Sequence, residues 1–332
     1  MSQVKVAVVG YGNVGRGVIA SLKNNTDLVL SCVVSRSPER VKKEFSAAPV
    51  FHIGEAEAAF KATGTEIAIL CGGSKDDLPK FGPQMAKLIN TVDSFDNHSR
   101  IPEYFGLMDE TAKAAGHVSV ISTGWDPGIF SLERTLAGAF IPGCRAYGFY
   151  GLGPAGGLSM GHSDALRTIP GVKDARQYTH AIPAAIKKVQ NGENPKFEPG
   201  DMHTRECFVV LEEGADKVAV TKAIMEMPGY FAPYDTTVNF VSQEELNTKY
   251  AGFPHDGMVA AAGTTGKGNP ARIEYRCAWG SNPEATANVL VAHARAAARL
   301  AREGRKGAFT ILDIPASYFT TLSREELLAH WM

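Results

Sequence analysis

Short apolar runs alternate with amphipathic stretches through the first 125 residues of the chain. Because these runs are apolar on both faces, they are typical of strands buried on both sides of a parallel sheet. Strands are expected at Val4–Val9, Leu28–Val34, Ile67–Cys71, Thr91–Phe95 and Val118–Ile121. Helices are expected between them at Val14–Lys23, Pro38–Phe45, Pro79–Leu88 and Pro102–Ala115. The alternation predicts βαβ units and an α/β fold with a doubly wound parallel sheet.

Beyond Trp125 a different pattern begins. The stretch Tyr147–Gly161 is rich in glycine, which predicts a loop that closely approaches another part of the protein. Strands are expected at Ala175–Ile182, Arg205–Leu211, Thr237–Val241, Met258–Thr264 and Arg272–Trp279, and helices at Ala184–Gln190 and Asp216–Met225. This pattern predicts a second, α+β domain with a mostly antiparallel sheet. The final predicted helix, Pro283–Glu303, stops at Gly304 and is expected to pack back on the first part of the chain.

The composition is that of an ordinary globular enzyme and argues against several classes of function. Of 332 residues, 44% are hydrophobic and 21% charged, and 34 basic and 35 acidic side chains leave a formal charge of -1. We therefore expect neither nucleic acid nor a membrane as a partner. The five cysteines include no CxxC pair, which predicts reduced thiols and no structural metal. The Met-Ser-Gln start lacks a charged targeting region, which predicts a cytoplasmic protein.

A glycine motif, Gly10-Tyr11-Gly12-Asn13-Val14-Gly15, lies between the first predicted strand and the first predicted helix. In this setting the first glycine of GxGxxG permits a tight turn, and the second lets the backbone reach a pyrophosphate. The third lets the helix pack closely on the strand, and the helix N-terminus offers free N–H groups to phosphate. We therefore predict a Rossmann-type dinucleotide site with these six residues as cofactor contacts, the alternative being an ordinary glycine-rich turn.

The end of the second predicted strand distinguishes between the two nicotinamide dinucleotides. Proteins that bind NAD usually place Asp or Glu there, about 20 residues beyond the glycines, to bind the ribose 2′-hydroxyl. Here the position reads Ser35-Arg36-Ser37, and an arginine between two hydroxyls suits a 2′-phosphate. The expected cofactor is therefore NADP.

Further strand ends reach the same edge of the predicted sheet, where open α/β sheets bind their ligands. They are Cys71-Gly72-Gly73-Ser74, Asp93-Ser94-Phe95-Asp96-Asn97-His98 and Ser122-Thr123-Gly124-Trp125-Asp126-Pro127-Gly128. We count as cofactor contacts the first of these segments together with Ser94, Phe95, Ser122, Thr123 and Gly124. Cys71 is interpreted as a packing thiol rather than a nucleophile. Asp93, Asp96 and His98 do not complete a metal site, so we expect no metal.

At this point the chain resembles a known family, the NADP-dependent meso-diaminopimelate D-dehydrogenases of lysine biosynthesis. Besides the segments above, the resemblance rests on Gly161-His162-Ser163-Asp164-Ala165-Leu166-Arg167, Ile169-Pro170-Gly171-Val172, Gln177-Tyr178-Thr179, Pro254-His255 and Asn282-Pro283. It covers essentially the whole chain. The chain departs from the family at Ser37, where many members carry a second arginine, and in the loop Gly151–Gly157, which looks about four residues longer than in some members.

The resemblance implies a reversible oxidative deamination of the D-centre of meso-2,6-diaminopimelate, with L-2-amino-6-oxopimelate (which can cyclise to tetrahydrodipicolinate), ammonia and NADPH as products. It implies that Asp96 and Asp126 act on the reacting amine, and which of them is the base stays open. It places Trp125 beside the reacting carbon, the backbone of Met160 and Gly161 at the D-carboxylate, and Tyr150 at the border of the pocket. It assigns the distal carboxylate and amine to Thr179, Arg205, His255 and Asn282.

Several of these residues have a purely structural alternative when each is considered alone. His255 suits a turn, Asn282 before Pro283 suits a helix cap, and Arg205 at a strand start suits a solvated charge. The resemblance over the whole chain favours the functional interpretation of all three. His162-Ser163-Asp164 is interpreted as loop structure near the substrate, because neighbours in sequence do not form a hydrolytic triad and no nucleophile elbow is present.

Three other functions compete with this one. Dihydrodipicolinate reductases carry a His-His-x-x-Lys segment that this sequence lacks, and a semialdehyde dehydrogenase needs a cysteine nucleophile in a suitable loop. A non-catalytic NADP sensor would not need the paired aspartates. We therefore expect an enzyme with residues 1–125 as its cofactor domain, against which residues 283–332 pack, and residues 126–282 as its substrate-binding and dimerisation domain. By the resemblance, it is expected to be a homodimer.

Overall fold

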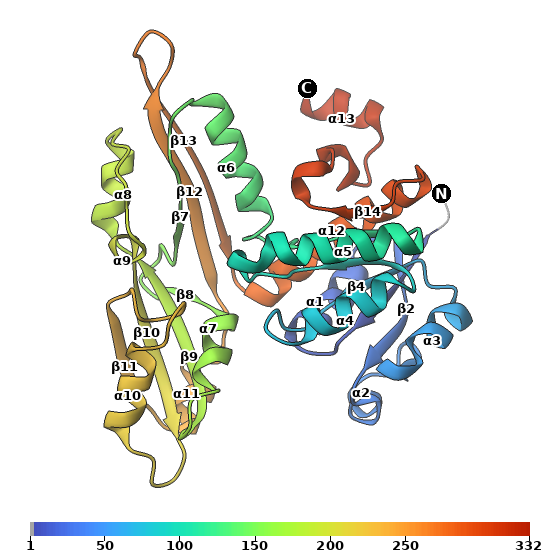
Figure 1. Cartoon of the computed structure of the whole chain (residues 1–332), viewed down its shortest axis with the longest axis horizontal. Coiled ribbons are helices and arrows are strands. Elements are labelled where there is room, and N and C mark those ends of the chain that lie inside the picture. The colour runs from blue at the N-terminus through green and yellow to red at the C-terminus, as the bar shows by residue number, and fades with distance from the viewer. Residues whose placement is uncertain (1–2) are drawn as a thin grey trace. The chain divides into compact units, whose positions relative to one another are not determined.

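The computed structural model of the chain describes residues 3–332. Its internal contacts form two compact units, which we describe separately (Figure 1). Unit 1 combines the chain up to Leu132 with Pro283–Met332, and unit 2 is the continuous segment Glu133–Asn282. The sequence places the functional boundaries at residues 125 and 282. The assignment of cofactor binding to one part and of substrate binding and dimerisation to the other stays a prediction.

Unit 1 is built on a seven-stranded parallel sheet (Figure 1). Its strands are β1 (Val4–Val9), β2 (Leu28–Ser35), β3 (Val50–His52), β4 (Ile67–Leu70), β5 (Asn90–Asp93), β6 (Val118–Val120) and β14 (Gly307–Phe309). Their order in the sheet is β14-β6-β5-β4-β1-β2-β3, so the chain first winds outward from β1 in one direction and then in the other. The predicted doubly wound parallel sheet is therefore confirmed.

The alternation of side chains along β1 creates two cores, one on each face of the sheet. Val4, Val6 and Val8 belong to one apolar cluster, whereas Ala7 and Val9 belong to another. The first cluster includes residues of α1 (Asn13–Leu22) and α12 (Asn282–Arg302), and the second includes residues of α3 (Ala56–Thr63), α4 (Asp77–Ala86) and α5 (Ile101–Ala115). Because successive strand side chains point to opposite faces, a continuous apolar run is what a doubly covered strand requires.

The last fifty residues complete unit 1. The side chains of Ala287, Leu290 and Val291 on α12 join the cluster that contains α1, and a Cβ added to Gly17 would lie 3.0 Å from the Cβ of Ala287. Gly17 therefore permits the two helices to pack closely. Strand β14 then pairs in parallel with β6 at the edge of the sheet, and α13 (Arg324–Trp331) follows.

Unit 2 contains two sheets rather than one. One sheet has the order β11-β10-β9-β8, and the other has the order β13-β12-β7. The strands are β7 (Ala146–Tyr150), β8 (Gly157–Leu158), β9 (Val172–Ala181), β10 (His203–Leu211), β11 (Thr236–Phe240), β12 (His255–Thr264) and β13 (Pro270–Trp279). All neighbours are antiparallel except β10 and β11, as expected for a mostly antiparallel α+β unit. Strands β12 and β13 form a long hairpin (Figure 1).

Helices cover both sheets of unit 2. Residues of α7 (Met160–Leu166) and α10 (Lys217–Met225) share an apolar cluster with β9 and β10. Leu246 of α11 (Gln243–Thr248) joins residues from the opposite side of the same two strands, and α8 (Pro183–Gln190) packs on β7 and β12. The remaining helical elements of the described chain are α2 (Pro38–Glu44), α6 (Ile129–Phe140), α9 (Pro199–Met202), η1 (Ile53–Glu55), η2 (His98–Arg100), η3 (Ile311–Asp313) and η4 (Ala316–Tyr318).

Some local expectations from the sequence are wrong. The glycine-rich stretch Tyr147–Gly161 is not one loop. Its first residues belong to β7, in which Tyr147 and Phe149, two positions apart, both point into the same core, and its last two residues begin α7. His162-Ser163-Asp164 consequently lies in a helix and not in a loop. Strand β5 ends at Asp93 instead of Phe95, since the Asp93 side chain accepts the Phe95 N–H and the chain leaves the sheet there. Helix α12 is not the final helix, because α13 follows it.

A buried arginine ties α12 to the start of the sheet. The side chain of Arg295 is 6% exposed, and its Nη2 lies 2.8 Å from Asp27 Oδ1 and 2.7 Å from Asn25 Oδ1. Its Nη1 donates to the carbonyl oxygen of Phe319 at 2.7 Å. One guanidinium therefore joins three segments of unit 1 that are distant in sequence.

We expect Arg295→Met to lower the free energy of unfolding by about 2–3 kcal/mol, because it leaves the partners of a buried charge without their donor. Chemical denaturation followed by circular dichroism measures this loss. The matched control is Arg302→Met on the same helix, whose exposed ion pair with Glu66 spans 3.7 Å and should contribute less than about 1 kcal/mol. Equal losses in the two variants would contradict the role assigned to Arg295.

Candidate active site

The glycine motif forms a turn that only glycine fits at two positions. Gly10 has a φ of +102°, and its N–H donates to the carbonyl oxygen of Val34 at 2.8 Å. A Cβ added to Gly15 would lie 2.1 Å from the carbonyl oxygen of Gly10, so the close approach of α1 to this turn requires glycine. A Cβ on Gly12 would meet nothing within 4 Å, which leaves open space in front of the helix N-terminus. This is the geometry that a pyrophosphate needs.

A cavity of about 440 Å³ lies in front of this turn. Of the cofactor contacts predicted from the sequence, ten line it: Gly10, Tyr11, Gly12, Asn13, Ser35, Arg36, Ser37, Cys71, Gly72 and Gly73. Val14 and Gly15 lie behind them in α1. Ser74, Ser94, Phe95, Ser122, Thr123 and Gly124 are not among its lining residues. The structure thus brings together the motif, the end of β2 and the end of β4.

The basic rim of this cavity is paired with carboxylates that the sequence analysis did not consider. Arg36 forms two contacts with Asp77, from Nη1 to Oδ1 at 3.0 Å and from Nη2 to Oδ2 at 3.2 Å. Arg16 and Arg40, which also line the cavity, both reach Glu44 of α2. Asp77 is distant from Arg36 in sequence, and only the positions of β2 and β4 on either side of β1 in the sheet could have indicated this pair.

Cys71 faces the same cavity as an unreactive thiol. Burial raises the pKa of Cys71 to about 12, so its sulfur is protonated at neutral pH. A nucleophilic cysteine needs the opposite shift, toward the thiolate. The structure thus agrees with the interpretation of Cys71 as a packing residue.

Asp93 connects the two loops that carry the predicted catalytic aspartates. This fully buried carboxylate accepts the N–H of Phe95 at 3.0 Å and the N–H of Ser122 at 3.1 Å on Oδ1, and the hydroxyl of Tyr104 at 2.8 Å on Oδ2. Its backbone oxygen accepts both the N–H and the hydroxyl of Thr123 at 2.9 Å. From the sequence Asp93 was considered only as a metal ligand, whereas the structure shows it holding two loops together.

Each of these loops has a second fixed point near its aspartate. The N–H of Asp96 donates to Ser74 Oγ at 3.0 Å, which connects this loop to the end of β4. Asp126 lies in a tight turn closed by the N–H of Gly124, which donates to the carbonyl oxygen of Pro127 at 2.7 Å. A Cβ on Gly128 would lie 1.9 Å from the carbonyl oxygen of Gly124, so this turn requires glycine. Trp125 is buried and packs edge-on against Phe130 at 5.2 Å between ring centroids.

Unit 2 contains a buried arginine that has no anionic partner. Arg205 on β10 is 7% exposed, lies opposite Thr179 of β9 in the sheet, and donates from Nη1 to the Thr179 hydroxyl. Its guanidinium lies 4.0 Å from the ring centroid of Tyr234, whereas its Nε is buried without a hydrogen-bond partner. Among the described residues no carboxylate pairs with it, and burial lowers the pKa of Arg205. A buried cation in this state suits an anion supplied by a ligand.

Two histidines lie close to Arg205: His162, which the sequence analysis interpreted as loop structure near the substrate, and His203, which it did not consider. Burial and the positive charge of Arg205 lower the pKa of both His162 and His203 to about 3, so both rings are neutral. His203 Nε2 accepts the N–H of Tyr150 at 3.0 Å, and the two rings stack at 5.2 Å. The Tyr150 hydroxyl in turn accepts from Arg134 at 2.8 Å. Tyr150 is therefore held from both its backbone and its side chain.

The glycine-rich segment after β7 makes room for the other predicted distal residues. A Cβ on Gly151 would lie 1.8 Å from the carbonyl oxygen of Thr179, and one on Gly157 would lie 2.5 Å from Nδ1 of His255. His255 and Asn282 are both buried, and Asn282 Nδ2 donates to the carbonyl oxygen of Leu158 at 3.1 Å. Met160 and Gly161 are the first two residues of α7. Unit 2 thus carries all the predicted distal residues: Thr179 on β9, Arg205 on β10 and His255 on β12, with Asn282 as the first residue of α12.

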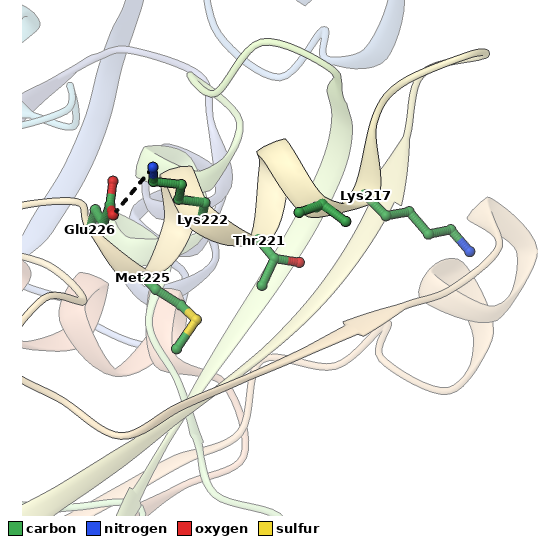
Figure 2. Close-up of a pocket in the computed structure, with 6 residues that line it drawn as sticks. Lys217, Thr221, Lys222, Met225 and Glu226 are labelled. Carbon is green, nitrogen blue, oxygen red and sulfur yellow. Dashed lines mark ion pairs between the residues drawn. The ribbon is translucent and has the colours of Figure 1, made fainter.

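A second hollow, of about 500 Å³, lies in unit 2 along α10 and is open to the surface (Figure 2). It is lined by Lys217, Val218, Thr221, Lys222, Met225 and Glu226, of which Lys222 and Glu226 form an ion pair across 3.9 Å. Among residues 3–332 no group of three His, Cys, Asp or Glu side chains is suited to a metal ion. Within the same range, no helix is both long enough and apolar enough to cross a membrane.

Comparison with known proteins identifies the family. Residues 124–281 match the family model described as the diaminopimelic acid dehydrogenase C-terminal domain. A meso-diaminopimelate D-dehydrogenase of Ureibacillus thermosphaericus is 46% identical over 327 residues, which are 98% of each chain. The chain belongs to the meso-diaminopimelate D-dehydrogenase family. The resemblance drawn from the sequence is thereby confirmed.

Solved structures of this family agree with that assignment. The structure of C. glutamicum DAP dehydrogenase in complex with DAP is 37% identical, has a TM-score of 0.93 and is matched over 100% of both chains. The structure of an engineered D-amino acid dehydrogenase bound to NADP+ is 36% identical, has a TM-score of 0.91 and is also matched over 100% of both chains.

In this family member, the charge of Asp93 should make stability depend on pH in a way that can be isolated. Burial raises the pKa of Asp93 from its ordinary value of 3.8 to about 6, although three hydrogen bonds oppose the shift. Because the folded pKa is the higher one, this group's contribution is complete below about pH 4 and is lost as pH rises through about 6. Asp93→Asn keeps an acceptor for the two backbone N–H groups but does not titrate.

We therefore expect the unfolding free energy of the wild type, minus that of Asp93→Asn, to fall between about pH 4 and pH 7. Denaturant titrations at four pH values measure it. Asp109→Asn is the control, because Lys113 and the Ala308 N–H lower the pKa of Asp109, so its contribution changes only below about pH 4. A constant difference for Asp93→Asn across this range would show that Asp93 does not titrate there.

Proposed function

We propose that this protein catalyses the reversible, NADP-dependent oxidative deamination of the D-centre of meso-2,6-diaminopimelate in lysine biosynthesis. The products are L-2-amino-6-oxopimelate, which can cyclise to tetrahydrodipicolinate, together with ammonia and NADPH. Arg205 carries the proposal: in a chain of this family, a buried guanidinium with no carboxylate of its own suits a dicarboxylate substrate.

The cofactor cavity of unit 1 fits NADP. The open space at Gly12 and the close packing at Gly15 suit a pyrophosphate at the N-terminus of α1, and Arg36 with Ser35 and Ser37 suits a 2′-phosphate. When NADP+ is bound, it supplies the acceptor for the hydride that leaves the substrate's D-carbon. The chain's own residues must therefore bind both ends of the substrate and handle its protons.

The residues of unit 1 suit the reacting end of the substrate. A carboxylate of Asp96 or Asp126 takes a proton from the D-ammonium group, which frees the nitrogen lone pair that assists departure of hydride from the same carbon. Either aspartate also suits the activation of the water that later attacks the imine carbon. Trp125 supplies a rigid apolar surface that limits access of bulk water to the reacting carbon.

The residues of unit 2 suit the distal end of the substrate, where no bond changes. Arg205 and Thr179 offer donors to the distal carboxylate, and His255 and Asn282 offer polar atoms to the distal amine. The neutral state of His162 and His203 keeps the positive charge of this region on Arg205. Because a buried guanidinium is costly to leave without an anion, Arg205 selects a substrate with a carboxylate at its far end, and His255 and Asn282 add polar atoms suited to the amine.

We also propose that the protein works as a homodimer in the cytoplasm. Family membership supports the dimer, and the five free cysteines agree with a reducing compartment.

The function is tested by adding meso-diaminopimelate to the protein with NADP+ and following NADPH absorbance. We expect NADPH to form with the meso isomer, and Asp96→Asn or Asp126→Asn to lower turnover. The residue that carries the base role should lose about 10²–10⁴-fold. Fluorescence titration should show nearly unchanged NADPH binding in both variants. Absence of NADPH formation by the wild type would refute the proposed reaction, and near-normal turnover of both variants would refute the roles of the aspartates.

Replacement of Arg205 tests the distal end of the substrate. We expect Arg205→Met to raise KM for diaminopimelate sharply and to lower kcat as well, because remote contacts also orient the reacting carbon. The wild type should reject D-alanine and D-norleucine by roughly 10⁴-fold or more, and the variant should narrow that gap. Lys217→Met, on the exposed face of α10, is the control that should change neither. Wild-type discrimination in Arg205→Met would place the distal site elsewhere.

A further inference from the structure

The end of β2 lacks a carboxylate in sequence, but the fold supplies one from another element. Asp77, the first residue of α4, lies beside Arg36, and both line the cofactor cavity with Ser35 and Ser37. The two ion-pair contacts, at 3.0 Å and 3.2 Å, use both carboxylate oxygens and both terminal nitrogens of the guanidinium. A fork of this kind binds a carboxylate or a phosphate equally well in geometric terms.

Asp77 is held in place by its neighbours, and Arg36 is the more exposed partner of the pair. The N–H of Asp77 donates to the carbonyl oxygen of Gly73 at 3.1 Å, and the next residue, Leu78, is buried in the core. A Cβ added to Gly72 would lie 2.6 Å from the Cβ of Asp77, so Gly72 allows Asp77 to sit this close to the end of β4. The Asp77 side chain is 26% exposed and the Arg36 side chain 65%.

The energies of these contacts favour exchange of one anion for another. An ion pair this exposed contributes about 0–1 kcal/mol, so a doubly charged phosphate can displace the carboxylate from Arg36. The carboxylate nevertheless stays at the site and opposes the incoming negative charge. In dinucleotide sites, a carboxylate at the adenine ribose accepts a hydrogen bond from the 2′-hydroxyl of NAD. Asp77 is therefore positioned to oppose a 2′-phosphate and to accept a 2′-hydroxyl.

We propose that Asp77 determines the cofactor preference of this protein, by competing with the 2′-phosphate of NADP for Arg36 and by accepting the 2′-hydroxyl of NAD. The protein therefore uses NADP with a preference smaller than Arg36 alone would give. This inference rests on the proposed NADP site, but it concerns binding rather than turnover.

The test is the dissociation constant of Asp77→Asn for NADP+ and for NAD+, measured by isothermal titration calorimetry without substrate. We expect NADP+ to bind about threefold to tenfold tighter and NAD+ about threefold to tenfold weaker than in the wild type. Asp76→Asn is the matched control, since it removes the same charge from the neighbouring exposed residue, which does not line the cavity. It should change each constant by less than about twofold.

The same substitution in a variant that lacks Arg36 shows whether the effect of Asp77 on NADP+ binding depends on Arg36. In Arg36→Leu, the further change Asp77→Asn should no longer tighten NADP+ binding by more than about twofold. Asp77→Ser, which keeps a polar residue at the first turn of α4, should reproduce the behaviour of Asp77→Asn, and melting temperatures check the fold of every variant. A gain in NADP+ affinity through a substitution does not arise from damage to the fold.

The proposal is overturned if Asp77→Asn and Asp77→Ser leave NADP+ binding unchanged or weaker, or if the gain persists in full without Arg36. It is also overturned if Asp76→Asn gives the same gain. Failure of the proposed function is a separate outcome: NADPH would not form with meso-diaminopimelate, while the binding constants of the Asp77 series would still be measurable.

Discussion

A single buried carboxylate, Asp93, fixes the positions of the two loops that carry the candidate catalytic aspartates, Asp96 and Asp126. Its carboxylate oxygens accept hydrogen bonds from Phe95, Ser122 and Tyr104, and its backbone carbonyl oxygen accepts two more from Thr123. Burial opposes the charge that these donors require, as the raised pKa of Asp93 shows. The protein thus gives up some stability at neutral pH to fix the loops on which both candidate catalytic aspartates lie.

The surroundings of Arg205, the residue proposed to bind the distal carboxylate of the substrate, differ from those of Asp93. Around Arg205 the chain supplies a buried positive charge, neutral histidines and an aromatic face, but no negative charge among the described residues. A buried guanidinium without an anionic partner is energetically costly, so binding of an anion to Arg205 is favourable.

Much of the cofactor cavity could be predicted from the sequence because its requirements are local. The tight turn at Gly10 and the close packing at Gly15 depend on neighbouring residues, and both are visible as a motif. The pairing of Arg36 with Asp77 was not visible, because it depends on which strands are adjacent in the sheet. Strand β7 was missed since glycine content outweighed the alternation of Tyr147 and Phe149. The distal residues could be assigned only through the family resemblance, because the burial of Arg205 away from a carboxylate is a tertiary property.

The discontinuity of unit 1 has a consequence for the order in which a growing polypeptide can fold. Helix α12 and strand β14 are synthesised only after the chain of unit 2. Until then one face of the parallel sheet lacks α12, and β6 lacks its outer neighbour. At about 5–20 residues per second, unit 2 takes roughly 8–30 seconds to translate. The nascent first part of unit 1 therefore keeps apolar surface exposed during translation, and chaperones act on surface of this kind.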